Sequence, residues 1–231
     1  MRRISIFTTA ISMLPLGHIP LLGTPTSLAT AAVVLATHSA HAQSVSAYID
    51  SGVEKGKRGD DKGAIADFTK AIEIDPQDAG SYYNRAVSYF QLKDYKKAIS
   101  DYSMAVKFFP NDFHAYSNRG NSQKMLGNYQ EAIADYDKAL EINPRYGIAY
   151  YNRGLAKGDL ENYTGAIADL NKAIEIDPKF SSAYLSRFII KGRLGDYQGA
   201  CLDIKKSELL QNQLASKLLN SENGVWCRNM R

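Results

Sequence analysis

Histidine and cysteine, the side chains that most often bind metals or act as nucleophiles, are scarce in this chain. Of its 231 residues only four are histidines, and His114 alone lies beyond residue 42. This scarcity leaves no histidine cluster for a metal ion, and no Cys–His or Ser–His–Asp arrangement is apparent. The glycines fall at turns and helix contacts rather than in a phosphate-binding loop. We therefore expect neither an enzyme nor a protein with a cofactor.

Acidic residues are missing from the first part of the chain, where Asp50 is the first to occur. Arg2 and Arg3 open the chain, apolar stretches follow, and an Ala-His-Ala sequence at 40–42 offers a cleavage site. Residues 1–42 thus look like a secretory signal peptide, which predicts an exported protein, periplasmic or secreted. Three prolines interrupt the apolar run, so we expect no integral membrane span in the mature chain. The alternative is an organelle lumen, or a membrane anchored through an uncleaved leader.

A large excess of charge of one sign is also missing. The formal net charge is +4, and acids and bases alternate along the chain after the leader. This balance argues against a surface for nucleic acid or for an anionic membrane.

What the chain does contain is a strict repeat. Four prolines stand 34 residues apart and align five units: 45–78, 79–112, 113–146, 147–180 and 181–214. Counted from the first residue of each unit, position 4 is always tyrosine, position 20 alanine and position 23 aspartate. Two apolar stripes at helical spacing recur in each unit, separated by a turn and closed by the proline, which Asn212 replaces in the fifth. This pattern predicts a repeat array in which each unit is a pair of helices.

The fourth unit shows a family likeness most clearly. It reads Ala-Tyr-Tyr-Asn-Arg-Gly at 149–154, then Glu-Asn-Tyr-Thr-Gly-Ala-Ile-Ala-Asp-Leu at 161–170, and ends near Pro178. Over residues 45–214 the units resemble tetratricopeptide repeats. The resemblance implies an all-α solenoid, in which antiparallel helix pairs stack into a right-handed superhelix. The inner groove of such a solenoid usually binds a peptide or an extended segment of a partner protein.

A candidate peptide groove follows from projecting the first helix of each unit at about 100° per residue. The tyrosines at position 4 fall on the stripe that faces the partner helix, so we expect them in the core. Positions 2, 6, 9 and 13 point away from this stripe. The candidate groove residues at these positions are Asn84, Val87, His114, Asn118, Asn121, Asn152 and Leu155. Asparagine can both donate to and accept from the backbone of an extended peptide; the alternative is that these residues only contact water.

Arginine occupies position 7 in four of the five units, and Ser51 replaces it in the first. Each arginine follows, by 18 residues, the aspartate at position 23 of the preceding unit. We predict an inter-repeat ion-pair ladder that joins Asp67 to Arg85, Asp101 to Arg119, Asp135 to Arg153 and Asp169 to Arg187. The alternative is that the arginines line a groove for acidic ligands.

The two cysteines, Cys201 and Cys227, both lie near the C-terminus. In an exported protein they predict a disulfide that holds a capping tail, residues 215–231, over the last repeat. The alternative is a small buried hydrophobic side chain and an unrelated thiol in the tail. The leucines spaced to form the apolar face of the cap are Leu214, Leu218 and Leu219.

These patterns together predict a scaffold, or an assembly or chaperone adaptor, that binds an extended segment of a protein partner outside the cytoplasm. Lysines that the family uses to clamp C-terminal carboxylates are not at the set groove positions, which disfavours the tails of cytosolic chaperones. Two other functions stay open: a self-associating structural element of the cell envelope, and a regulator that binds small ligands in the same groove. The sequence does not indicate the oligomeric state.

Overall fold

The described part of the chain is built from helices. The computed structural model describes residues 44–221, 224, 227 and 228; the predicted signal peptide and several residues of the predicted tail lie outside this part. Within the described residues there is no β-strand. None of the helices found there has the length and apolar character that a membrane crossing requires.

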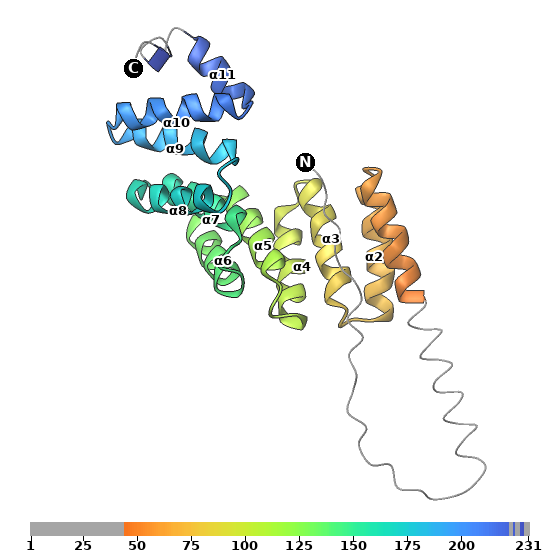
Figure 1. Ribbon diagram of the computed structural model, residues 1–231. Coiled ribbons are helices and arrows are strands. Elements are labelled where there is room, and N and C mark those ends of the chain that lie inside the picture. The colour runs from red at the N-terminus through yellow and green to blue at the C-terminus, as the bar shows by residue number, and fades with distance from the viewer. Residues whose placement is uncertain (1–43, 222–223, 225–226, 229–231) are drawn as a thin grey trace, which may run out of the picture. The chain divides into compact units, whose positions relative to one another are not determined.

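The helices follow one another as antiparallel pairs (Figure 1). The helical residues 44–57 pack against α2 (Asp61–Ile74). The next pairs are α3 (Ala79–Gln91) with α4 (Tyr95–Phe108), α5 (Phe113–Met125) with α6 (Tyr129–Ile142), α7 (Gly147–Asp159) with α8 (Tyr163–Ile176), and α9 (Ser181–Arg193) with α10 (Tyr197–Leu209). A shorter helix, α11 (Gln213–Asn220), packs on α10.

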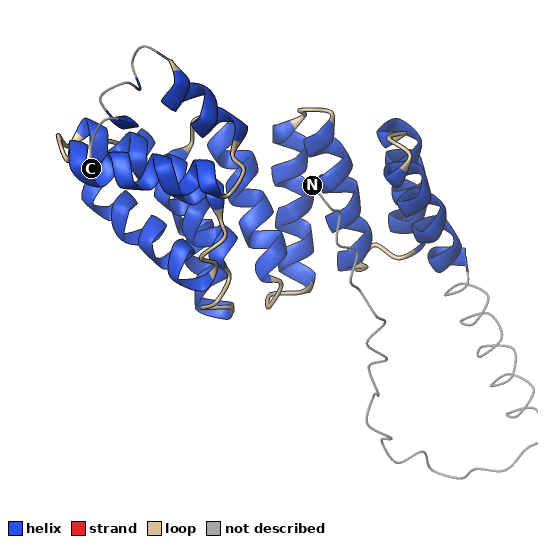
Figure 2. Cartoon of the chain, turned by 45° about the horizontal axis from the view of Figure 1, so that its top comes forward, coloured by secondary structure: helices blue, strands red, loops and turns tan. Residues whose placement is uncertain are grey.

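Two rows of helices result from this packing. Each odd-numbered helix from α3 to α9 contacts its own even-numbered partner, and α3, α5 and α7 also contact the next odd-numbered helix. The even-numbered helices from α2 to α8 mainly contact the odd-numbered helices before and after them. We call α3, α5, α7 and α9 the odd row. Helices connected by short loops make up the whole of this stack (Figure 2).

Small residues bring the two helices of a pair close together. The alanines at position 20 are completely buried in all five units: Ala64, Ala98, Ala132, Ala166 and Ala200. On the facing helix, a Cβ added to Gly120 would lie 2.9 Å from Cε1 of Tyr136 and 3.1 Å from the carbonyl oxygen of Ala132. The close packing of the two helices therefore requires a glycine on one helix and an alanine on the other.

The turn inside each pair is fixed by one residue in the left-handed conformation. It is glycine in three units (Gly59, Gly127 and Gly195) and Lys93 or Glu161 in the other two, with φ between 59° and 83°. Such a residue ends a helix because its backbone cannot continue the helical hydrogen bonds. The link between pairs is different: after the proline the chain passes through an N-cap residue with ψ near 80–100°, as at Asp78 and Asp112.

Candidate partner-binding face and the polar network behind it

The predicted groove residues lie on three neighbouring helices of the odd row. Asn84 and Val87 are on α3; His114, Asn118 and Asn121 are on α5; Asn152 and Leu155 are on α7. Positions 7, 8 and 11 contact the even-numbered partner helix: Arg119 and Gly120 on α5 lie against Asp135 and Tyr136 on α6, and Lys157 on α7 binds Asp169 on α8. Positions 2, 6 and 13 therefore lie on the side of the odd row that faces away from the partner helices, and position 9 lies at the edge of this side, where Asn121 still reaches Tyr136 on α6. We call this side the odd-row face.

Two of the predicted asparagines are engaged in the fold itself. The side-chain amide of Asn118 donates to the hydroxyl of Tyr83 in the preceding unit at 2.9 Å. The carbonyl oxygen of the Asn121 side chain accepts from the hydroxyl of Tyr136 at 2.8 Å. Both side chains thus position tyrosines, and their role in a groove stays a prediction.

The other two asparagines are differently placed. Asn84 and Asn152 are partly buried, and neither side-chain amide forms a hydrogen bond with any residue that the structure describes. They stand at position 6 on α3 and α7, on either side of Asn118. Their donors and acceptors are available to a ligand, which is the property that the groove prediction requires.

The apolar groove residues are less exposed than the sequence pattern predicts. Val87 packs against the buried cluster that includes Tyr102 and Ala86. Leu155 is partly buried. The projection alone does not show how deeply a side chain sits between two neighbouring helices of the odd row.

His114 is exposed at the start of α5, beside aromatic rings. Its ring centroid lies 5.4 Å from that of Tyr146. Asp112 caps this helix, accepting from the backbone N–H groups of His114 at 2.9 Å and Ala115 at 3.1 Å. Burial raises the pKa of the Asp112 carboxyl above its ordinary value, although these backbone donors and the nearby His114 act in the opposite direction. Taken over the described residues, no group of three or more His, Cys, Asp or Glu side chains could hold a metal ion.

The predicted inter-repeat ion pairs are wrong. In the structure each arginine at position 7 binds the aspartate at position 23 of its own unit; Arg85, for example, donates from Nε to Asp101 at 2.7 Å and from Nη2 at 2.9 Å. The pairs formed are Arg85–Asp101, Arg119–Asp135, Arg153–Asp169 and Arg187–Asp203. They replace the predicted pairs Asp67–Arg85, Asp101–Arg119, Asp135–Arg153 and Asp169–Arg187.

The physical reason is the direction in which position 7 faces. Position 7 lies at the border of the core stripe, so the projection leaves open whether its side chain meets the partner helix or the preceding unit. In the structure the guanidinium lies over the position 4 tyrosine of the same helix, as Arg153 lies 5.3 Å from the ring centroid of Tyr150. From this position the guanidinium can form a bidentate pair with the carboxylate of the aspartate on the partner helix.

Each arginine nevertheless joins two units, through an acceptor that the sequence pattern does not reveal. The remaining terminal nitrogen, Nη1, donates to position 25 of the preceding unit, two residues beyond the predicted aspartate. The acceptors are Thr69 at 3.1 Å, Ser103 at 3.1 Å, Asp137 at 2.5 Å and Asn171 at 2.6 Å. A polar side chain at position 25 in four consecutive units is the signal that could have located them.

The first unit has no arginine, and other groups satisfy its aspartate. Asp67 accepts from Ser51 Oγ and from Lys55 Nζ, each at 2.6 Å. Burial alone would raise the pKa of Asp67, but these two hydrogen bonds and the lysine charge hold it below its ordinary value. All five position 23 aspartates are buried and paired, so this network supports the helix pairs rather than a ligand.

The C-terminal end is closed by apolar contacts. Cys201 and Cys227 are buried with Cα atoms 5.1 Å apart, within the range for a disulfide, and the structure places their sulfur atoms in bonding position. They belong to a buried cluster with Ile204 on α10 and Leu219 on α11. The predicted disulfide is thus supported by this geometry and is tested below.

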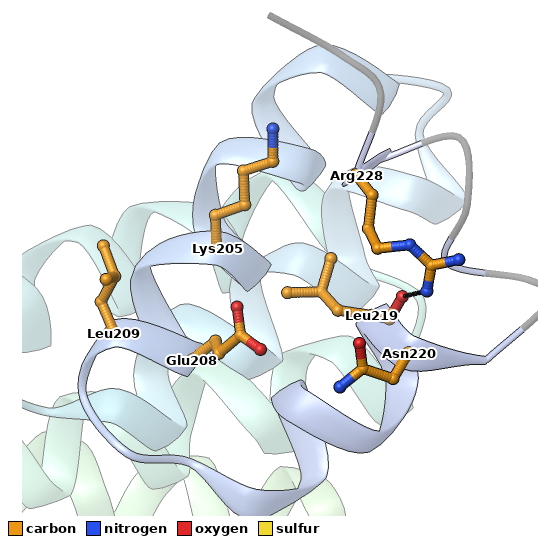
Figure 3. A pocket seen from close by; sticks show the side chains of 6 residues that line it. All are labelled: Lys205, Glu208, Leu209, Leu219, Asn220 and Arg228. Atoms are coloured by element: carbon orange, nitrogen blue, oxygen red, sulfur yellow. Dashed lines mark hydrogen bonds between the residues drawn. The ribbon is translucent and has the colours of Figure 1, made fainter.

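A cavity of about 350 Å³ lies between α10, α11 and Arg228 (Figure 3). Its lining residues are Lys205, Glu208, Leu209, Leu219, Asn220 and Arg228. Arg228 donates from Nη1 to the carbonyl oxygen of Leu219. Lys205 stands at position 25, where the four preceding units carry the acceptors for an arginine. No residue of this cavity belongs to the predicted groove.

Helix pairs stacked in two rows, with a repeating polar bridge between them, define a helical-repeat solenoid. The family model described as "Tetratricopeptide repeat" matches residues 79–112, 114–146 and 147–180, and a related model, "TPR repeat", matches 57–93. Together they cover more than half of the chain, which therefore belongs to the tetratricopeptide repeat family. No curated protein sequence matches the chain significantly.

Solved structures of tetratricopeptide repeat proteins resemble this chain. A structure of MamA protein is 26% identical, with a TM-score of 0.68 over 78% of this chain and 97% of that one. The structure of "YrrB: a TPR protein with an unusual peptide-binding site" is 19% identical, with a TM-score of 0.63 over 74% and 88%. The "First TPR of Spaghetti (RPAP3) bound to HSP90 peptide SRMEEVD" is 31% identical, with a TM-score of 0.51 over 52% and 94%.

Proposed function

We propose that this protein is an interaction scaffold that binds an extended segment of a partner protein along the odd-row face. The observation that carries the proposal is the contrast between the two sides of the odd row. Toward the partner helices, the arginines and aspartates at positions 7 and 23 are paired with one another. On the odd-row face, the amides of Asn84 and Asn152 have no partner among the described residues.

The placement of these amides at the same position on two helices of the odd row suits an extended chain. Equivalent positions on successive odd helices form a row across the array, and an extended peptide offers a backbone donor and acceptor at regular intervals. The structure bound to an HSP90 peptide supports this mode for a related repeat domain. Such binding needs no catalytic group, which agrees with the expectation that the protein is not an enzyme.

Capture of the partner with matched variants tests the proposal. The mature chain is used as bait alongside Asn84→Ala/Asn152→Ala and a control, Asn111→Ala, in the exposed turn between α4 and α5. We expect the double variant to lose the partner while its helix content and Tm stay close to those of the unchanged chain. Retention of the partner by the double variant would contradict binding through these amides.

Two other results would favour the other functions. Assembly that depends on concentration in analytical ultracentrifugation, without a captured partner, would support a self-associating structural element. A thermal shift with small molecules alone would support a small-ligand regulator. Each result can be obtained with the same purified chain.

We further propose that binding takes place outside the cytoplasm. The basic start, apolar stretches and Ala-His-Ala sequence of residues 1–42 support export, and a disulfide between Cys201 and Cys227 would persist in an oxidising compartment. Mass spectrometry of the protein from the cells that produce it is the test. A mature chain that starts at Gln43 is expected, whereas an intact leader on a cytoplasmic protein would refute export.

A further inference from the structure

Partly buried lysines on the odd helices follow a rule. At position 11, Lys157 binds Asp169 at 2.8 Å and Lys191 binds Asp203 at 2.9 Å. Lys55, at the same position in the first unit, binds Asp67 at 2.6 Å. Each of these cations thus has a buried carboxylate on its own partner helix.

Lys124 breaks this rule by one residue. In the third unit position 11 is Gln123, and the lysine stands at position 12, where the other units carry Gly56, Phe90, Gly158 and Gly192. One residue along a helix turns the side chain by about 100°, away from Asp135 on α6. Lys124 is partly buried and forms no ion pair with any residue that the structure describes.

The neighbouring unit shows where position 12 faces. A Cβ added to Gly158, at position 12 of α7, would lie 2.9 Å from Cδ1 of Ile190 on α9. The same Cβ would lie 3.9 Å from Cβ of Ala166 on α8, so position 12 of the fourth unit lies between its own partner helix and the odd helix of the next unit. By the same packing Lys124 on α5 lies against α7, at the junction of two helices of the odd row.

The charge of Lys124 is poorly compensated at this junction. Burial lowers the pKa of its ammonium group, and the exposed Asp159 near the end of α7 acts in the opposite direction without coming within ion-pair distance. A partly buried cation without a hydrogen-bonded counter-ion costs free energy. Every comparable lysine of the odd helices avoids that cost, so the exception calls for a carboxylate from outside.

Resting on the proposed function, we propose that Lys124 receives an acidic side chain of the partner's extended segment at the junction of α5 and α7. The surroundings suit such a segment. Met125, 52% exposed, follows Lys124, and Leu155 and Asn152 stand at positions 9 and 6 of α7. An aspartate or glutamate flanked by an apolar residue would meet one cation, one free amide and two apolar side chains.

A first test uses stability alone. Because Lys124 forms no ion pair with the described part of the chain, Lys124→Met should leave the Tm unchanged or raise it, as expected where a binding residue is kept at a cost to the fold. The matched change Lys157→Met, at position 11, should lower the Tm because it removes a contact to the buried Asp169. A drop in Tm for Lys124→Met as large as that for Lys157→Met would show that Lys124 has a structural role and would overturn the proposal.

The second test measures binding to a synthetic peptide array. The mature chain is applied to ten-residue peptides of mixed sequence in which one position carries either glutamate or glutamine. We expect about tenfold stronger retention on the glutamate member of the best pairs, as for a hydrogen bond to a charged group. The preference should vanish in Lys124→Gln and persist in Lys138→Gln, a control whose lysine pairs with Glu141 on α6.

The outcomes separate this inference from the function on which it rests. Peptide binding without a glutamate preference, or a preference that survives in Lys124→Gln, would overturn the role of Lys124 and leave the scaffold intact. A folded chain that retains no peptide from the array and captures no partner would overturn the scaffold itself. Binding of single-stranded DNA in place of peptides, dependent on Lys124, would assign the cation to a different ligand and also overturn the inference.

Discussion

The interior junctions of the array and its C-terminal end join neighbouring helices by different chemistry. Between interior units, Arg119 on α5 binds Asp135 of its own unit and reaches Ser103 of the preceding one at 3.1 Å. At the end of the array the acceptor position is occupied by Lys205, and α11 packs Leu219, only 3% exposed, against α10. An arginine beside Lys205 would meet a like charge, so the interior junction cannot be repeated there.

The path of the chain changes at the same place. Gln211, with φ of 62°, has the left-handed conformation of Glu161, with φ of 59°, in the turn inside the fourth unit. The backbone hydrogen bonds correspond as well: Asn212 donates to Ser207 as Asn162 donates to Lys157. The chain thus leaves α10 by a turn of the kind that the other units use inside a pair. This array thus ends where both its junction chemistry and its link change.

The largest effect is expected from breaking an interior ion pair. Asp169→Ala should reduce the free energy of unfolding by about 3–5 kcal/mol, because Arg153 and Lys157 both lose a buried carboxylate. Urea unfolding of the single variants and of Asp169→Ala/Arg153→Ala should show strong coupling between the two sites. In Asp135→Ala/Arg153→Ala, the pair predicted from the sequence, the effects should be closer to additive; equal coupling in both cycles would contradict the contacts described.

At the C-terminal end the disulfide between Cys201 and Cys227 should contribute most to stability. Cys227→Ala should lower the free energy of unfolding by roughly 2–4 kcal/mol, chiefly by freeing the unfolded chain. The measurement is urea unfolding with and without a thiol reductant, together with the mass of the unreduced protein. The reductant should destabilise the unchanged chain and leave Cys227→Ala unaffected, and two free thiols in the native protein would refute the bond.

The bridge between interior units should contribute less. Ser103→Ala removes the acceptor for Arg119 Nη1 and should cost about 0.5–1.5 kcal/mol. The corresponding change at the end of the array, Lys205→Ala, should remove no such bridge, because a lysine ammonium group cannot accept a hydrogen bond from an arginine. Thermal unfolding of both variants checks the difference, and equal losses would argue against the bridge.

The smallest effects concern two glycines at the same unit position. A Cβ added to Gly192 in α9 meets nothing within 4 Å, so Gly192→Ala should stabilise the chain by about 0.5–1 kcal/mol through the unfolded state and helix propensity. Gly158→Ala should gain the same stabilisation, but its new methyl group would press against the flexible end of the Ile190 side chain. Its net effect on the free energy of unfolding should therefore be near zero. Equal gains at both sites, measured by thermal unfolding, would mean that position 12 faces no neighbour in either unit.

The candidate site could be predicted from the sequence only in part. Helical projection placed Asn84 and Asn152 on a face away from the partner helices, because that depends on local periodicity alone. It could not tell that the hydroxyls of Tyr83 and Tyr136 reach Asn118 and Asn121, since those contacts join side chains from different helices. The sequence does show that the lysine of the third unit stands at position 12 instead of position 11. It does not show which neighbouring helix a side chain at position 12 faces, and this decides whether Lys124 finds a counter-ion.

The sequence by itself determined the period, the all-α repeat class and the kinds of residue that meet, because helix pairs form from local patterns that recur every 34 residues. Only the tertiary structure decided which aspartate each arginine binds and which acceptor it shares with the preceding unit. A residue at the edge of a helical stripe has two neighbours within reach, and the packing of whole helices selects between them. The same packing leaves Lys124 without an ion pair among the residues that the structure describes, which local periodicity alone does not reveal.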